Sequence, residues 1–334
     1  LKFSAVKTIT PSSMELILYY CTFFAVLTHK PGEIKTTAVI VAGVLILIIG
    51  DISYWSYNRF FRDELKITIF DVGQGNAALL EFPGGYTMMI DGGGFSDNSV
   101  FDVGERLVAP VLWKRKIKTV DTLVLTHPNA DHLNGLLYIA ENFNVKSVWT
   151  NHQPVDTFGY KRFMEIIRER KIDLPPLPEI FGEHEIGGAS VKVIYPPPDY
   201  LSRKDREGAD DINNNSLVIK VEIGQVSFLF TGDIMAPAEA ELCSSWSDSL
   251  KSTVLIAPHH GSDTSSTPEF INWVKPKFVI ISAGWQNRFD FPDPLVVRRY
   301  RKQKCGILRT DLNGAVQFVT DGNSYSVDSM LVSR

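Results

Sequence analysis

Two stretches near the start of the chain are dense in apolar residues and predict a pair of membrane helices. They cover residues 14–28 and 37–57, separated by a polar turn at residues 29–33. The second stretch has no charge over residues 36–50 and ends in aromatic and then basic residues, an order typical of a helix that leaves a bilayer. The first is short and contains Glu15, so we expect it to span only partly or to pack against other helices. The alternative is a pair of helices buried in a protein core.

Beyond residue 62 the pattern changes to short apolar strands that alternate with helices. The expected strands are 65–72, 77–82, 86–90, 119–125, 145–149, 190–195, 217–223, 225–230, 253–257, 278–282, 307–310, 315–320 and 324–327. The expected helices are 103–116, 133–140, 157–171, 236–243, 268–274 and 294–303. Two runs of strands joined to helices predict an α/β fold, with two sheets packed face to face and helices outside. We therefore divide the chain into a transmembrane segment, residues 1–62, and a second domain, residues 63–334.

Composition narrows the classes of protein that the chain can represent. Lysine and arginine number 34 against 38 acidic residues, a formal net charge of -4, so affinity for nucleic acid would have to come from local basic patches. The three cysteines are far apart and odd in number, which argues against a disulfide framework or a cysteine zinc site. The chain does not begin with methionine, and we expect it to be the C-terminal piece of a longer membrane protein. The polar loop at 196–215 is expected to be exposed and mobile.

Candidate metal ligands follow three of the predicted strands. His127, Asp131 and His132 come after strand 119–125, Asp233 after strand 225–230, and the pair His259 and His260 after strand 253–257. Imidazole and carboxylate groups gathered at strand ends predict a metal site. Taken alone, the group after strand 119–125 also has a simpler interpretation, in which His127 is a loop histidine and Asp131 caps a helix.

Eight motifs carry a resemblance to a known family. They are D-V-G-Q-G at 71–75, I-D-G-G at 90–93, H-P-N-A-D-H at 127–132, N-S-L-V at 215–218, T-G-D at 231–233, P-H-H-G-S at 258–262, S-A-G at 282–284 and R-T-D at 309–311. In this order they resemble the metallo-β-lactamase superfamily, and more closely the C-terminal domain of ComEC-type DNA-internalisation competence proteins. The resemblance implies an αββα sandwich with a dinuclear metal site at one edge, after the last membrane helices of a channel region.

On that resemblance the candidate ligands can be sorted. Asp131, His132, Asp233 and His259 would hold one ion, and Asp233 would bridge to a second ion held by His127. Asn129 stands where many members have a ligating histidine, and its amide oxygen is a weaker ligand. Asp91 would orient a ligating histidine, or else cap a turn. Asp71 and Asn215 are further expected supports, and the ions would be zinc or manganese, one or two of them.

Three residues are candidates for direct roles in hydrolysis. Asp131 would hold the attacking water, which metal ions make acidic. His260 would protonate or stabilise the leaving oxygen, or would only pack or bond to backbone. Ser262 would donate to a substrate oxygen, or would cap the helix that begins near residue 268.

Several positions depart from the pattern of the family. Asn76 stands where the competence proteins often have aspartate, and Phe291 stands where they often have histidine before proline. Residues 213–215 are asparagines where a third histidine is usual. The second metal therefore has few strong ligands, and a mononuclear, weakly dinuclear or catalytically silent site are all compatible with the sequence.

The resemblance implies DNA, single-stranded or duplex, as the substrate or partner. Lys161 and Arg162 on one predicted helix and Arg298 and Arg299 on another are candidate phosphate contacts, although such residues are usually only solvated. Three aromatic residues are candidates for base stacking: Tyr160, Tyr300 and Trp285.

Three functions follow from these expectations. The first is a metal-dependent nuclease of a DNA-uptake channel in the inner membrane, partnered by the upstream channel region, the membrane and other competence proteins. The second is a degenerate module that binds DNA or gates the channel, and the third is a hydrolase of another phosphoester. Basic residues flanking the hairpin favour a cytoplasmic domain weakly, whereas the family role favours an extracytoplasmic one.

Overall fold

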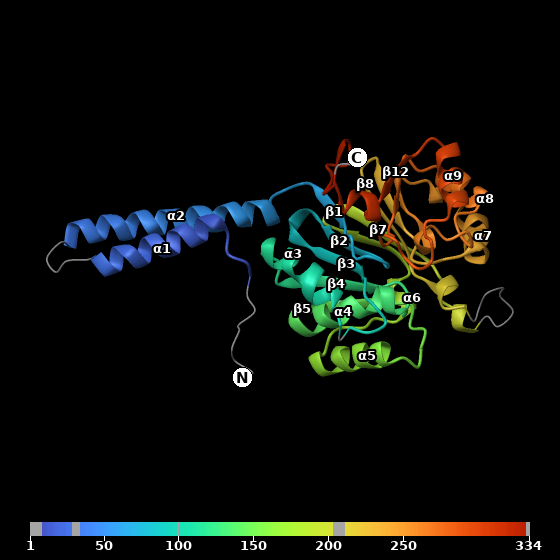
Figure 1. Cartoon of the computed structure of the whole chain (residues 1–334), viewed down its shortest axis with the longest axis horizontal. Helices are drawn as coiled ribbons and strands as arrows, with labels where there is room; N and C mark the ends of the chain where they lie inside the picture. Colours follow the sequence, from blue (N-terminus) through green and yellow to red (C-terminus); the bar gives the residue numbers. More distant parts are fainter. Residues whose placement is uncertain (1–8, 29–33, 99, 203–210, 332–334) are drawn as a thin grey trace.

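A long helical pair extends from a two-sheet domain (Figure 1). The computed structural model describes residues 9–28, 34–98, 100–202 and 211–331. The pair consists of α1 (Ser13–Thr28) and α2 (Ile34–Phe60), which pack against each other. Ser12 and Glu15 cap α1 reciprocally, the Glu15 N–H donating to Ser12 Oγ over 3.1 Å and the Ser12 N–H donating to the Glu15 carboxylate. The turn predicted at residues 29–33 lies outside the described residues.

The exposure of α2 bears on whether the apolar stretches are membrane helices or core helices. None of the apolar window within Ala38–Phe60 is buried among the described residues, so α2 does not belong to the core of the two-sheet domain. Among the described residues α2 is the one helix that is long and apolar enough to cross a membrane by length and composition. The 16 residues of α1 reach about 24 Å, less than the hydrocarbon core of a bilayer. The structure thus contains one candidate span, with a shorter apolar helix beside it.

The first sheet has seven strands in the order β14-β13-β1-β2-β3-β4-β5. Neighbours run antiparallel from β14 to β3 and parallel from β3 to β5. The bounds are β1 Leu65–Ile69, β2 Ala77–Glu81, β3 Thr87–Gly92, β4 Thr119–Leu125, β5 Asn144–Thr150, β13 Val316–Thr320 and β14 Tyr325–Ser329.

The second sheet also has seven strands, in the order β12-β11-β10-β9-β8-β7-β6. The strands from β12 to β9 are parallel, and those from β9 to β6 are antiparallel. The bounds are β6 Gly182–Ile186, β7 Ala189–Tyr195, β8 Val218–Ile223, β9 Val226–Phe230, β10 Val254–Ile256, β11 Phe278–Ile281 and β12 Gly306–Arg309.

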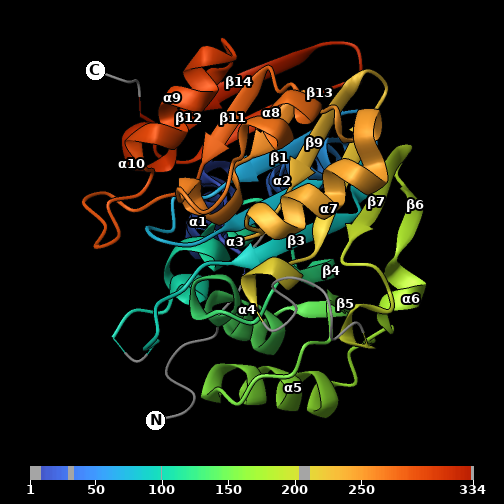
Figure 2. The ribbon, with the colours of Figure 1, turned by 90° about the vertical axis from the view of Figure 1, so that its right-hand side faces the viewer.

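Helices cover the outer faces of both sheets, which gives the predicted αββα sandwich (Figure 2). The helices on the first sheet are α3 Ala109–Lys114, α4 Ala130–Asn142 and α5 Phe158–Arg170. Those on the second are α7 Ala236–Trp246, α8 Pro268–Val274 and α9 Pro294–Lys302. Two further short helices are α6 Leu177–Ile180 and α10 Thr310–Asn313. One apolar cluster lies between the sheets and one lies under each helical layer, so the predicted fold class is confirmed.

Three local differences from the predicted elements have physical causes. Strand β6 was not predicted, because it is an edge strand with polar residues in succession at positions 183–185. The helix expected at 103–116 opens with a wider turn over Gly104–Val108 before α3 begins. The loop expected to be exposed at 196–215 contains the buried side chains of Tyr200, Asn214 and Asn215, and its residues 203–210 lie outside the described residues.

Candidate metal centre

The start of α4 brings two ligand candidates to the end of β4. His127 follows β4, and Asp131 and His132 lie in the first turn of α4. The helix approaches β3 closely, because a Cβ at Gly135 would lie 2.0 Å from the Gly92 carbonyl oxygen, and the Gly135 N–H donates to Gly93 O over 2.8 Å. This close packing places His132 beside Asp91, which lies in β3.

The second sheet contributes Asp233 and His260. Asp233 follows β9 after Gly232, whose positive φ of 52° reverses the chain there. His260 lies in the turn Pro258–Gly261 after β10 and also has a positive φ, of 54°. Side chains from the edges of two facing sheets therefore converge at one place, as the strand ends predicted.

Four side chains come together closely enough to share one ion. Asp131, His132, Asp233 and His260 each offer a ligand atom, and these atoms all lie within 4.8 Å of one another. The His132 Nε2 to Asp233 Oδ1 distance is 3.2 Å, and His260 Nε2 lies 3.3 Å from Asp131 Oδ2 and 3.4 Å from Asp233 Oδ2. Two ligands at about 2.1 Å from a tetrahedral ion are roughly 3.4 Å apart. The spacing therefore fits a divalent ion such as zinc.

The imidazoles of His132 and His260 are each oriented by a hydrogen bond at Nδ1, the ring nitrogen farther from the cluster. The Nδ1 atom of His132 contacts Asp91 Oδ2 at 2.8 Å, and that of His260 contacts Ser282 O at 3.0 Å. These oxygens accept, so each Nδ1 carries a proton and each Nε2 is turned toward the cluster, where it can bind a metal ion once its own proton is lost.

His127 is held in the same way. Its Nδ1 lies 3.2 Å from Ser216 Oγ, which already donates to Asn213 O, so the imidazole is the donor. The Nε2 atoms of His127, His132 and His260 and the Oδ1 atom of Asp233 are buried and have no hydrogen-bond partner among the described residues. A bound cation would satisfy these buried atoms together.

The charges in the cluster are strongly coupled. Burial favours neutral imidazoles, but the adjacent carboxylates outweigh it, raising the pKa of His260 to about 9 and that of His132 well above its usual value. Burial also favours neutral acids, but the imidazoles hold the pKa values of Asp131 and Asp233 below their usual range. Burial, reinforced by the charge on His132, lowers the pKa of His127 to about 3. The carboxylates thus favour positive charge between them, which a divalent cation can supply in place of protons.

A second ion would find fewer ligands. His127 Nε2 lies 3.8 Å from Asp233 Oδ2, so a bridging Asp233 is compatible with the structure. Asn129, a candidate ligand, instead donates from its side-chain nitrogen to Asn213 Oδ1 over 2.7 Å. The residues present therefore fit one ion well and a second one poorly.

The structure brings His260 into the cluster, whereas His259, the residue expected there, has other contacts. The Nδ1 atom of His259 lies 3.0 Å from Thr264 Oγ1, and its Nε2 lies 3.4 Å from Asn213 Nδ2. Both histidines adopt the left-handed backbone conformation, and successive residues of such a turn direct their side chains differently. His260, expected to act on the leaving oxygen, occupies the ligand position instead.

The remaining site candidates lie at different distances from the cluster. Asp91 contacts His132 as predicted and also accepts from the Thr126 N–H over 2.8 Å. Asp71 accepts from the Gly73 N–H over 3.3 Å and so closes its own turn. Asn215 donates from its side chain to Gln153 over 3.1 Å. Ser262 lies 2.9 Å from Thr264 Oγ1, and the cap of α8 that it was expected to supply comes from Thr267.

The predicted DNA contacts are largely engaged within the protein. Arg162 pairs with Glu141, Glu165 and Glu169, and Lys161 pairs with Asp156. Arg299 donates to two backbone carbonyls, and Arg298 is exposed.

Two of the three aromatic residues considered for base stacking are buried. Tyr300 is fully buried and lies 2.8 Å from Ser266 Oγ, and Tyr160 is also buried, so neither ring can stack on a base. Trp285 is 72% exposed and keeps that expected role.

Two residues that support the site have no ligand signature in the sequence, because each contributes only a hydroxyl group. Ser216 contacts His127 and accepts from the Asp233 N–H over 3.0 Å, so it positions one residue from each sheet. Thr126 donates to Asp91 Oδ2 over 2.8 Å. In the sequence, the only indication for Thr126 is that it precedes His127. The only indication for Ser216 is that it lies just before a predicted strand.

A row of rings leads away from the cluster along the segment between β11 and α9. The centroids of His259 and Phe291 are 5.8 Å apart, and Phe289 stacks on Phe291 at 5.5 Å. The guanidinium of Arg288 lies 4.7 Å from the Phe289 ring centroid. Phe289 is 46% exposed, so the outer end of the row is open to solvent.

Comparisons with known proteins give a family match and two related competence proteins. Residues 70–285 match the Metallo-beta-lactamase superfamily. ComE operon protein 3 of Bacillus subtilis is 30% identical over 267 residues, covering 76% of this chain and 33% of that protein. Competence protein ComA of Neisseria gonorrhoeae is 26% identical over 303 residues, covering 91% and 38%. The chain therefore spans about a third of the length of these curated relatives.

Solved structures of low sequence identity were also matched. The metallo-beta-lactamase fold protein YhfI from Bacillus subtilis is similar with a TM-score of 0.46 and 11% identity, over 74% of this chain and 96% of YhfI.

Proposed function

The chain belongs to the metallo-beta-lactamase superfamily, as its motifs predicted, and we propose that it is a metal-dependent phosphodiesterase that hydrolyses DNA in a membrane channel for DNA uptake. The observation that carries the hydrolase proposal is the set of buried, unpartnered Nε2 atoms facing Asp131 and Asp233. The names of the two competence relatives support DNA uptake as the setting.

Residues of the chain would have two roles at the ion, as ligands and in orienting the attacking water. Asp131, His132, Asp233 and His260 would hold zinc or manganese, which when bound supplies an acidic water and a Lewis acid for a phosphate oxygen. The Asp131 side chain is 30% exposed whereas that of Asp233 is 3% exposed, so substrate would approach over Asp131. Asp131 would therefore orient the attacking water, and Asp233 would serve as a buried ligand.

The row of rings from His259 to Arg288 supports a nucleic-acid strand as substrate. Exposed aromatic rings bind unpaired bases by stacking, and a neighbouring arginine attracts the backbone phosphates. Phe289, Trp285 and Arg288 lie on the same segment beside the cluster. We propose that they receive single-stranded DNA.

A cleavage assay on the full chain in detergent tests the proposed activity. Labelled single-stranded and duplex oligonucleotides, a general phosphodiester and a panel of other phosphoesters would be incubated with manganese or zinc. We expect DNA cleavage that Asp131→Asn and Asp233→Asn reduce by about 100-fold or more, because each removes a metal ligand. Asp248→Asn changes an exposed carboxylate and serves as the matched control.

The assay also separates the competing functions. Absence of cleavage by metal-loaded protein would contradict the nuclease proposal. Cleavage restricted to another substrate of the panel would support a hydrolase of that phosphoester instead.

A second candidate function rests on the hydrogen bond between Asn129 and Asn213. That pair stands where the family resemblance places ligands of a second metal. A site with one ion can be retained to bind DNA or to gate the channel without hydrolysis. In that case DNA binding would persist in Asp233→Asn, and neither protein would cleave.

We further propose that the chain works in the inner membrane, as part of a multi-pass protein with its large domain outside the cytoplasm. Its partners would be the upstream channel region and other competence proteins. The exposed apolar surface of α2 supports the membrane setting. Protease added to spheroplasts should cut within the large domain; protection of that domain would contradict this orientation.

A further inference from the structure

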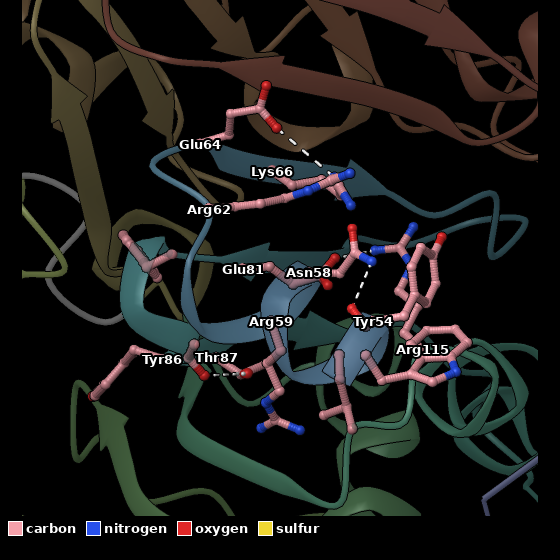
Figure 3. Close-up of a pocket in the computed structure, with 14 residues that line it drawn as sticks. Tyr54, Asn58, Arg59, Arg62, Glu64, Lys66, Glu81, Tyr86, Thr87 and Arg115 are labelled. Carbon is pink, nitrogen blue, oxygen red and sulfur yellow. Dashed lines mark hydrogen bonds and ion pairs between the residues drawn. The ribbon is translucent and has the colours of Figure 1, made fainter. Parts of the chain in front are cut away.

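A cavity lies where the end of α2 meets the first sheet (Figure 3). Its volume is about 220 Å³, smaller than pockets for drug-sized ligands. Side chains from α2, β1, β2 and β3 line it, together with Arg115 and Ile117. The residues that line the cavity include none of the four candidate metal ligands.

Positive charge exceeds negative charge around this cavity. Four basic residues line it against two acidic ones, Glu64 and Glu81, and the basic residues are Arg59, Arg62, Lys66 and Arg115. The ion pair with Glu81 offsets Arg115. Arg62 lies 3.8 Å from Glu64, but both side chains are 44% exposed, and such surface pairs are weak. The cavity therefore has an excess of two positive charges in a chain whose net charge is -4.

One donor at the cavity has no hydrogen-bond partner within the described residues. Arg59 donates through Nη1 to Lys116 O over 3.1 Å, while its buried Nε has no partner. Neither Arg59 nor Lys66 forms an ion pair with a described carboxylate. Cations and N–H donors without acceptors are the groups that bind phosphate oxygens.

The position of the cavity points to a lipid. Tyr54 and Trp55 precede it on α2, and aromatic residues followed by basic ones mark the level of lipid headgroups. We propose that the cavity binds the phosphate headgroup of an anionic phospholipid. The apolar surface of α2, exposed up to this level, would contact the acyl chains of the same lipid.

This binding does not depend on the metal centre or on DNA cleavage. Figure 3 shows Arg62 and Lys66 extending in the same direction, while Arg59 extends away from them. Arg62 and Lys66 therefore form the side of the cavity that can be altered without removing the Arg59 contact to Lys116. A headgroup bound there would join the end of the helix to the sheet.

The test uses the 334-residue chain in nanodiscs that contain equal amounts of phosphatidylglycerol and phosphatidylcholine. Native mass spectrometry of the released protein counts the lipids of each kind that are retained. We expect preferential retention of phosphatidylglycerol, reduced about 25-fold in the double variant Arg62→Gln and Lys66→Gln, since each cation near a membrane contributes about fivefold. Arg168→Gln with Lys251→Gln removes the same charge from exposed positions elsewhere and should leave the preference unchanged. Arg62→Lys with Lys66→Arg should retain it and shows that charge, not folding, is responsible.

Other outcomes overturn the proposal. Equal retention of the two lipids by the unaltered chain would do so, as would an equal fall in the control variant. Displacement of phosphatidylglycerol by millimolar inorganic phosphate would assign the cavity to free phosphate. Loss of oligonucleotide binding in the double variant with unchanged lipid retention would assign it to DNA.

Discussion

His259 and His260 are adjacent in the chain but have different surroundings. His260 is buried among carboxylates, whereas His259 contacts Thr264 and Asn213 at the edge of the cluster. Its pKa is lowered chiefly by burial, so at neutral pH it carries no charge that could compete with a cation. The backbone conformation of one turn therefore decides which of these two adjacent histidines lies in the cluster.

Replacing each histidine in turn tests this distinction. His260→Ala should lower the affinity for zinc or manganese by about 100-fold or more, because it removes a ligand, and His259→Ala should change it by less than about tenfold. Competition with a chromophoric chelator measures both affinities. Equal losses in the two variants would mean that His259 also binds the ion.

Asp91 offers a second prediction among single residues. It accepts from His132, from the Thr126 N–H and from the Thr126 hydroxyl. We expect Asp91→Ala to reduce metal affinity about 10- to 100-fold and the free energy of unfolding by about 1–3 kcal/mol. Asp121→Ala is the matched control, because Asp121 is a buried carboxylate that accepts from the Thr87 N–H outside the cluster. It should lower thermal stability but leave metal titrations unchanged; the proposed role of Asp91 fails if both variants bind metal equally well.

At the scale of elements, the contact between α4 and β3 determines where the ligands lie. The helix carries Asp131 and His132, and its approach depends on Gly135 facing the backbone of Gly92. A side chain at Gly135 would push α4, with its first turn, away from β3.

Gly135→Ala should therefore be destabilising even though alanine favours helices. Overpacking of this kind costs about 1–3 kcal/mol in the free energy of unfolding. We also expect weaker metal binding, measured on the same sample as chemical denaturation. Gly43→Ala introduces the same methyl group into α2, where nothing lies within 4 Å, and should not destabilise the protein. A neutral result for Gly135→Ala would show that α4 can shift without affecting the site.

At the scale of the whole molecule, the three apolar clusters of the sandwich include no residue from α1 or α2. The large domain thus has its own core, and the helical pair has an exposed apolar surface. The two parts should therefore differ in their requirement for a lipid-like environment.

Removal of residues 1–62 tests this difference. We expect residues 63–334 to remain in solution without detergent, to unfold cooperatively and to bind about one metal ion per chain. The full chain should float with vesicles. Aggregation of the shortened chain in the absence of detergent would show that the helical pair contributes to folding of the domain.

The sequence predicted the sandwich and the convergence of the strand ends, because apolar periodicity and polar residues after strands are local signals. It did not distinguish His260 from His259, since that depends on backbone angles in a turn. It also missed Ser216 and the burial of Tyr300, which arise only when distant segments pack. Strand β6 was missed for a related reason: its pairing with β7, not its own composition, makes it a strand.

Lys116 connects the helical pair to the sandwich at several points. Its ammonium group contacts Glu15 and the Thr10 carbonyl and lies 5.4 Å from the Trp55 ring centroid, while its own carbonyl accepts from Arg59. These four contacts meet at one residue and limit rotation of the sandwich about the end of α2. Under the function proposed above, a DNA strand would meet the metal ligands at a constant distance from the bilayer, and that distance would set the length of strand left before cleavage.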